Sequence, residues 1–287
     1  MIFSADSSRL ASASCDGTVR LWDTSDAGQG QCIGVQSRFG WICSIAISAD
    51  GSRLASTDDA TDVWFWDSST GACIGVPMSH GAVGPMIFSP DGHRLASGFN
   101  DGSVGLWDGR TGAHIITLAG HSAVVSSAAF SPDGLWLAVG SSDHAVRLLD
   151  SRTGSHITTF KEHSRWAKSV TFSADGSRLI SKSWDSNLLL WDITDIARPR
   201  VLCEKTAIDE FYLSTRNSLF LLETRTDPIL YGLTVLNLGD GVSHFICLFP
   251  PDILPRRVVV NPEASFATIV CDDGSALFLD ISKVPIS

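Results

Sequence analysis

The sequence predicts an all-β protein made of repeated sheets of short strands. In residues 86–121, four short apolar runs alternate with turn sequences such as Ser89-Pro90-Asp91-Gly92. In that turn, proline presets a backbone dihedral and glycine tolerates a positive φ. Apolar runs of this length, bounded by Gly, Asp, Asn and Pro, are typical of the strands of an antiparallel meander.

The same pattern recurs along the whole chain. In each repeat, the third apolar run ends in a Trp-Asp dipeptide or its equivalent. The intervals between these ends are 44, 41, 42, 42, 45 and 43 residues. A period of this size with four strands per repeat predicts a β-propeller, because one four-stranded sheet cannot bury both faces alone. The closing residues are Asp23, Asp67, Asp108, Asp150, Asp192, Asn237 and Asp280.

On these residues the chain resembles the WD40-repeat β-propeller proteins over nearly its whole length. Its regular SPDG, SADG and LAS segments are similar in style to the WD40 arrays attached to large signalling receptors in fungi. The resemblance implies a seven-bladed propeller in a single domain, residues 1–287. The repeats are expected at about 1–38, 39–80, 81–121, 122–163, 164–205, 206–250 and 251–287.

Composition restricts the class of partner. The chain has 287 residues, of which 44% are hydrophobic, so it can bury a large core. No apolar run approaches the roughly eighteen residues that a membrane span needs, and no secretory signal fits, because Met1 already lies in a predicted strand. The formal net charge is −10, which repels phosphate backbones. We expect neither nucleic acid nor membrane as a partner.

The cysteines indicate the compartment. Seven cysteines form an odd set without a Cys-x-x-Cys pair, and Cys32 and Cys73 share one repeat position in the motif CIGV. Free thiols in a reducing compartment are the plain interpretation, so the cytoplasm or the nucleus is expected.

Repeats one and two carry two loops that could suggest a ligand. The Gly-rich connection from Thr24 to Gln31 lacks the spacing and the strand-to-helix context of a phosphate loop, so a surface loop is expected. In repeat two, Asp58, Asp59 and Asp62 could bind a hard cation. Their spacing is not that of a calcium loop, and a turn in which one Asp caps backbone amides is favoured.

Repeats three to five are the most regular. The family resemblance implies a buried tetrad of a His, a Ser, an Asp and a Trp in each blade, and these side chains hydrogen-bond to one another. Because each set recurs at the repeat period, a structural role is preferred over a hydrolase triad. Repeat four keeps His121 and Asp143 but has Val139 and Leu149 at the other two places. The matching sets are His80, Ser97, Asp101 and Trp107 in repeat three, and His163, Ser181, Asp185 and Trp191 in repeat five.

Repeats six and seven diverge from this pattern. Leu236-Asn237 replaces the Trp-Asp pair in repeat six, and Asn261-Pro262-Glu263 replaces the usual turn in repeat seven. Since repeat seven stops shortly after its third strand, a three-stranded last blade without strand-exchange closure is expected. Either the seam between blades one and seven is weak, or the chain is part of a longer product whose missing strands lie upstream.

No catalytic constellation is found in the sequence. The eight histidines show neither a His-Glu-x-x-His nor a His-x-His spacing, and no Gly-x-Ser-x-Gly elbow occurs. We therefore predict a protein that is not an enzyme, with no cofactor, no metal and no small-molecule substrate.

Two features suggest binding of other proteins. In WD40 proteins, partners dock on the face made by the loops before the first strand and between the second and third strands. Large aromatic and polar residues fall in those loops. They either form a docking site or fold over neighbouring loops to shield the core, and both readings stay open. The candidates are Trp41, Trp166, Trp184, Arg38, Arg165 and Asn100.

The second feature is a pair of similar segments, Trp107-Asp108-Gly109-Arg110 and Leu149-Asp150-Ser151-Arg152. They resemble the box by which some WD40 proteins engage the adaptor of cullin-RING ubiquitin ligases, although a frequent turn sequence is the favoured explanation.

The sequence therefore predicts a non-catalytic scaffold or recognition module that binds proteins or peptides on its loop face and acts in signalling. The alternatives are a substrate receptor of a cullin-RING ubiquitin ligase and, in another class, a propeller enzyme with its active site at the channel mouth. Acidic side chains converging on that mouth would favour the enzyme, whereas tryptophans with arginines would favour the binding module.

Overall fold

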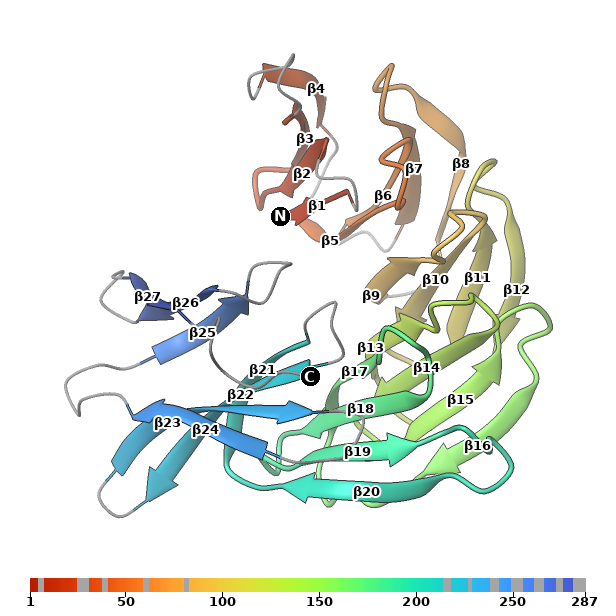
Figure 1. Cartoon of the computed structure of the whole chain (residues 1–287). Coiled ribbons are helices and arrows are strands. Elements are labelled where there is room, and N and C mark those ends of the chain that lie inside the picture. The colour runs from red at the N-terminus through yellow and green to blue at the C-terminus, as the bar shows by residue number, and fades with distance from the viewer. Residues whose placement is uncertain are drawn as a thin grey trace. The chain divides into compact units, whose positions relative to one another are not determined.

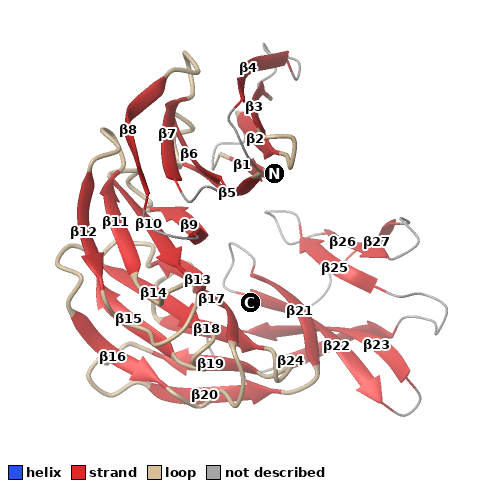
Figure 2. Cartoon of the chain, turned by 180° about the vertical axis from the view of Figure 1, so that it is seen from behind, coloured by secondary structure: helices blue, strands red, loops and turns tan. Residues whose placement is uncertain are grey.

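In a computed structural model, the protein is all-β over the residues that the structure describes, and Figure 2 shows strands and loops throughout this part. No helix in this part is long and apolar enough to cross a membrane. The described residues are 1–4, 8–24, 31–37, 41–58, 62–79, 83–213, 218–226, 229–237, 243–248, 255–260, 266–271 and 276–280.

The strands follow one another in antiparallel sheets, here numbered one to seven in chain order (Figure 1). Sheets one to six have four strands and sheet seven has three within the described residues. Sheets one to four comprise β1 (Ile2–Phe3), β2 (Arg9–Ala13), β3 (Thr18–Asp23) and β4 (Gln31–Ser37); β5 (Ile42–Ile47), β6 (Arg53–Asp58), β7 (Asp62–Asp67) and β8 (Cys73–Ser79); β9 (Val83–Phe88), β10 (Arg94–Phe99), β11 (Val104–Asp108) and β12 (His114–Leu118); and β13 (Val125–Phe130), β14 (Trp136–Ser141), β15 (Val146–Asp150) and β16 (His156–Phe160).

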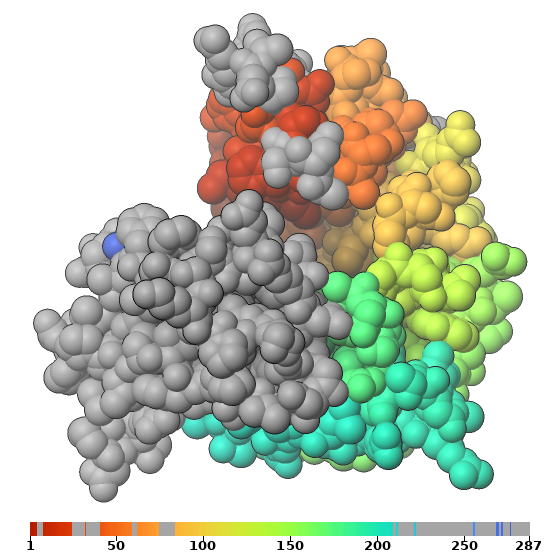
Figure 3. Space-filling model, in the orientation of Figure 1, coloured from red at the N-terminus to blue at the C-terminus, as the bar shows by residue number. Residues whose placement is uncertain are grey.

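The remaining sheets continue the pattern. The outermost strand of sheet five, β20, lies at the surface in cyan in Figure 3 and exposes Val201 and Leu202. Sheets five to seven comprise β17 (Ala167–Phe172), β18 (Arg178–Ser183), β19 (Leu188–Asp192) and β20 (Arg200–Lys205); β21 (Ile208–Leu213), β22 (Ser218–Thr226), β23 (Ile229–Asn237) and β24 (Ser243–Leu248); and β25 (Pro255–Val260), β26 (Phe266–Cys271) and β27 (Ala276–Asp280).

The predicted period matches the sheets. Each of the seven residues that close the Trp-Asp positions is the last residue of the third strand of its sheet, including Asn237 at the end of β23 and Asp280 at the end of β27. The third strand ends there because the Asp side chain turns back onto the next amides: Asp108 Oδ1 accepts from the backbone N–H of Arg110 and of Thr111.

The turns between first and second strands are built alike. Ser89 Oγ donates to Asp91 Oδ1 at 2.5 Å and accepts from the backbone N–H of Arg94. Gly92 has a φ of 70°, which a residue with a Cβ rarely adopts. The SPDG sequence therefore forms the predicted turn, and Ser131 and Ser173 repeat its hydrogen bonds in the next two sheets.

The chain forms two compact regions, Met1–Thr171 and Phe172–Ser287, here called the N-terminal and C-terminal regions. In the N-terminal region, apolar side chains of neighbouring sheets pack together, as where Phe65 of sheet two meets Phe88 and Trp107 of sheet three. The C-terminal region has a cluster around Leu188, Leu190 and Ile208. The division falls at the end of β17, so sheet five is described below from β18 to β20.

The last sheet has three strands in the part of the chain that the structure describes, as expected. The absence of strand-exchange closure, the shared axis of the sheets and the single domain stay predictions. The predicted loop at residues 25–30 and Asp59 lie outside the described residues.

Candidate functional site

Three apolar side chains of the N-terminal region occupy the same register and face solvent. Trp41 is 64% exposed, Val124 40% and Trp166 54%. Each stands directly before the first strand of its sheet, and the next residue is buried in every case. These buried residues are Ile42, Val125 and Ala167.

In sheet four, hydrogen bonds to backbone carbonyls hold the loop around Val124 in place. The carbonyl of Val124 accepts from the backbone N–H and the hydroxyl of Ser142, and the carbonyl of Ala123 accepts from Ser141 Oγ. The loop is thereby pinned to the turn between the second and third strands. Since the residue after it points into the core, the side chain at position 124 points outward.

Trp184 holds a comparable place in the C-terminal region. It follows β18 directly and is 60% exposed. The turn is fixed by Asp185, whose backbone N–H donates to Ser183 Oγ and whose Oδ1 accepts from the backbone N–H of Asn187. The turn that carries this exposed indole is therefore held by its own hydrogen bonds.

The polar candidates fall in three groups. Arg165 is exposed beside Trp166, and Asn100 is exposed after β10, at the place that Trp184 takes after β18. Arg38 lies outside the described residues. In the N-terminal region the structure thus gives Trp41 and Trp166 one common register, and it places Arg165 next to the latter.

The tetrad residues are buried and paired within their sheets. Trp107 Nε1 donates to Ser97 Oγ at 2.8 Å, and Trp191 Nε1 donates to Ser181 Oγ at 2.9 Å. Both serines are fully buried, so each hydroxyl serves the indole of its own sheet rather than a substrate.

The other predicted members have their own contacts. Asp101 accepts from the backbone N–H and the hydroxyl of Ser103, and His163 is buried. His80 lies outside the described residues. The complete four-member network therefore stays a prediction in both repeats.

Sequence reasoning missed two further pairs of the same kind. Trp66 Nε1 donates to Ser56 Oγ at 2.9 Å, and Trp22 Nε1 donates to Ser12 Oγ at 3.1 Å. In all four sheets the serine precedes the tryptophan by ten residues, as expected for partners on adjacent strands of a tight hairpin. That spacing was the signal that could have found them.

Repeat four replaces this pair by a different contact. Val139 and Leu149 are buried in an apolar cluster. His121 Nδ1 lies 2.9 Å from Asp143 Oδ1, and its Nε2 lies 3.2 Å from the carbonyl oxygen of Val139. The carbonyl oxygen of Val139 thus contacts His121 in repeat four, where the family tetrad is expected to have a serine hydroxyl.

The acidic turn of repeat two is a capped turn in its described part. Asp58 accepts from the backbone N–H of Asp62 and from Trp64 Nε1 at 3.0 Å. Burial, together with the charge of Asp58, raises the pKa of Asp62 above its usual value. Across the residues with a described placement, no three His, Cys, Asp or Glu side chains gather as metal ligands.

The two Asp-x-Arg segments are also explained by their turns. In both, the arginine backbone N–H donates to the Asp Oδ1 two residues before it, at 3.0 Å for Arg110 and 2.9 Å for Arg152. The following threonines bind the same oxygens through N–H and hydroxyl groups. The repetition therefore follows from turn chemistry, as the sequence favoured.

Comparisons with known proteins agree with this architecture. The family model described as "WD domain, G-beta repeat" matches residues 1–23, 71–108, 112–150 and 154–192. A chain in the crystal structure of the mitotic checkpoint complex is similar in fold, with a TM-score of 0.73 and 20% sequence identity. The alignment covers 97% of this chain and 88% of that one. A search of curated proteins finds no match.

Proposed function

Since the chain belongs to the WD40-repeat β-propeller proteins, we propose that it is a non-catalytic scaffold that holds partner proteins or peptides on its loop face. WD40 repeats are protein-interaction modules in general. The loop face is here defined by the residues before the first strand of each sheet and by the turns between second and third strands, with Trp41 and Trp166 as its anchors in the N-terminal region.

The observation that carries the proposal is the exposure of both indoles at one register. Large aromatic side chains that stay in water are unusual unless a partner covers them, and Trp is enriched among residues that dominate binding energy. Val124, exposed at the same register, would continue the apolar surface. A guanidinium at Arg165 would add a polar contact at its edge.

Chemistry and charge support protein partners over other classes. The chain carries a net charge of −10, which disfavours nucleic acid. Ser97 and Ser181, the hydroxyls of the recurring His-Ser-Asp sets, are buried under indole rings, which supports a protein without hydrolase activity. Cys15 and Cys73 are exposed thiols outside any disulfide, which supports a reducing compartment, the cytoplasm or the nucleus. A role in signalling there belongs to the same proposal.

The test compares two pairs of exposed apolar side chains. Partners are first identified by proximity labelling in the source cell, and the strongest is then produced and titrated against the purified chain. The double variant Trp41→Ser with Trp166→Ser should lose at least roughly tenfold in affinity, as expected when hot-spot aromatics are removed.

The matched control is Ile116→Ser with Ile157→Ser, which removes two exposed apolar side chains from outer strands. It should leave the affinity unchanged. Equal affinity for wild type and the tryptophan variant, with both folded, would show that the partner docks elsewhere.

A further inference from the structure

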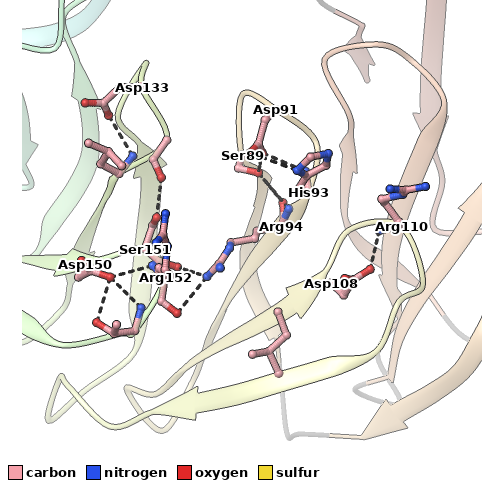
Figure 4. A pocket seen from close by; sticks show the side chains of 14 residues that line it. Ser89, Asp91, His93, Arg94, Asp108, Arg110, Asp133, Asp150, Ser151 and Arg152 are labelled. Carbon is pink, nitrogen blue, oxygen red and sulfur yellow. Dashed lines mark hydrogen bonds and ion pairs between the residues drawn. The ribbon is translucent and has the colours of Figure 1, made fainter.

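A groove with a volume of about 780 Å³ lies between sheets three and four of the N-terminal region, at the strand ends opposite to the loop face. It is formed by the turns between first and second strands and between third and fourth strands (Figure 4). Its walls carry Asp91, Asp108, Asp133 and Asp150 together with Arg94 and Arg152.

The repeats themselves show what the Asp at the end of a third strand binds. In sheets one, two and five, this Asp lies directly across from the Arg that opens the second strand, and the two side chains form an ion pair. The N–O distances are 2.5 Å for Arg9–Asp23, 2.9 Å for Arg53–Asp67 and 2.9 Å for Arg178–Asp192.

Sheet three has the same register but a different contact. Arg94 lies across from Asp108, yet its Nη1 donates to the carbonyl oxygens of Ser151, at 2.6 Å, and Arg152, at 3.1 Å (Figure 4). The guanidinium thus ties sheet three to the turn of sheet four instead of neutralising its own Asp.

Sheet four has no arginine at this place. Trp136 lies across from Asp150. Among sheets one to five, the two closing aspartates that receive no guanidinium from the second strand, Asp108 and Asp150, are therefore the two that line the groove.

Both carboxylates are charged, and the hydrogen bonds of the turn engage only one oxygen of each. Hydrogen bonds from Thr111, the backbone N–H first, lower the pKa of Asp108, and those from Thr153 do the same for Asp150. In each case the turn takes Oδ1. Neither Asp forms an ion pair with any residue whose placement is described.

We propose that this groove binds an arginine-bearing segment of a partner protein, whose guanidinium groups pair with Asp108 and Asp150 as Arg53 pairs with Asp67. Guanidinium and carboxylate match in geometry and charge. The lining has four aspartates against Arg94, Arg110 and Arg152, and Arg94 is engaged by carbonyl oxygens. The chain as a whole has a net charge of −10, which attracts a basic segment over longer distances.

Apolar side chains complete the site. Ile115 and Leu135 line the groove and are both exposed. The aliphatic stem of a bound arginine, or an apolar neighbour in its segment, can pack on them while the guanidinium reaches the carboxylate. The groove is separate from the loop face, so it would serve a second partner, and its test does not depend on the proposal for Trp41 and Trp166.

The probe is a fluorescein-labelled eight-residue peptide of alternating Arg and Leu, titrated against the purified chain by fluorescence anisotropy. The variant is Asp108→Asn with Asp150→Asn, in which the amide oxygens keep the turn hydrogen bonds while both charges are lost. We expect roughly tenfold weaker binding, the scale of losing charged hydrogen bonds. The control Asp67→Asn removes one charge outside the groove, is compared with Asp108→Asn and Asp150→Asn made singly, and should bind like wild type.

Trp136→Arg gives a second, independent variant. It places in sheet four the arginine that sheets one, two and five have. The guanidinium of this arginine should pair with Asp150 and so lower the affinity for the peptide. Unchanged affinity in both variants would overturn the proposal. If Asp67→Asn lowered the peptide affinity as much, the binding would be general charge attraction and not a property of the groove. Tighter binding of a peptide of alternating Glu and Leu would show that the groove takes acidic segments instead.

Discussion

His121 and Asp143 form a buried pair in which Nδ1 of the imidazole lies 2.9 Å from Oδ1 of the carboxylate. Both side chains are almost fully buried, and Arg147 approaches the other carboxylate oxygen at 3.3 Å. The pair links the loop before sheet four to the turn between β14 and β15, since the backbone N–H of Ser122 also donates to Asp143.

This pair predicts acid sensitivity of the N-terminal region. Burial lowers the pKa of His121 below 6.5, outweighing the opposing effects of Asp143 and the Val139 carbonyl. Burial raises the pKa of Asp143, but hydrogen bonds from Ser122 and His121 more than compensate, so it falls below 3.8. Both groups therefore stabilise the fold above their unfolded pKa values, and this stabilisation is lost as the pH falls.

The measurement is the thermal midpoint between pH 8 and pH 5. Wild type should lose stability as the pH falls through 6.5, and His121→Gln should show a flatter profile with a lower midpoint at pH 8. The variant His93→Gln, changed at an exposed histidine, should follow wild type. A wild-type profile that is flat over this range would contradict the assignment.

The Trp107–Ser97 pair predicts a large stability loss on truncation. Trp107→Ala removes a fully buried ring and leaves Ser97 Oγ without its donor, so it should cost roughly 3–5 kcal/mol. Leu149, buried at the equivalent place of sheet four, should tolerate Phe at a cost of about 1–3 kcal/mol for overpacking. Urea unfolding of both variants gives the comparison, and equal losses would count against a special role of the indole.

Asp192 predicts a second acid-sensitive element, in the C-terminal region. Hydrogen bonds from Thr194, first from its side chain, lower the pKa of Asp192 to about 2, with help from Arg200 and Arg178. Because the folded pKa is below the unfolded value, its stabilisation is complete above pH 3.8 and fades toward pH 2. Asp192→Asn should destabilise the chain at pH 7.

The denaturation midpoints of wild type and Asp192→Asn should converge between pH 4 and pH 2. Asp195→Asn, changed at an exposed carboxylate three residues away, is the control and should track wild type throughout. A gap between Asp192→Asn and wild type that stays constant down to pH 2 would show that the ionised carboxylate is not what matters.

The weak-seam hypothesis predicts an order of hydrogen exchange. Strand β1 has only two residues, and sheet seven has three strands in its described part, whereas sheets three and four each have four strands of five or six residues. Amides of β1–β4 and β25–β27 should therefore exchange before those of β9–β16. Equal protection, measured by mass spectrometry of peptides from each sheet, would refute the hypothesis.

The repeat pattern was predictable because its signals are local. An Asp that must cap its own turn marks the end of a third strand, and a Gly in the left-handed region marks the turn between the first and second strands. The position of the strand end recurs even in the divergent sixth repeat, where Asn237 ends β23 without a tryptophan before it.

The direction of long side chains was not predictable. Arg53 and Arg94 open equivalent strands and face equivalent aspartates, yet one pairs within its sheet and the other reaches the carbonyls of the next. That choice depends on an oxygen 57 residues away in sequence, which no local pattern encodes. The groove between sheets three and four could not be predicted from the sequence for the same reason.

The contact of His121 with the Val139 carbonyl has an evolutionary consequence. A main-chain oxygen is present whatever side chain occupies the position. The contact between His121 Nε2 and the carbonyl of residue 139 therefore does not depend on which side chain stands there. With apolar residues at the places of the serine and the tryptophan, the histidine thus still has its carboxylate and a main-chain oxygen as neighbours. A blade of this kind can drift far in residue identity while its loop keeps the same anchoring point.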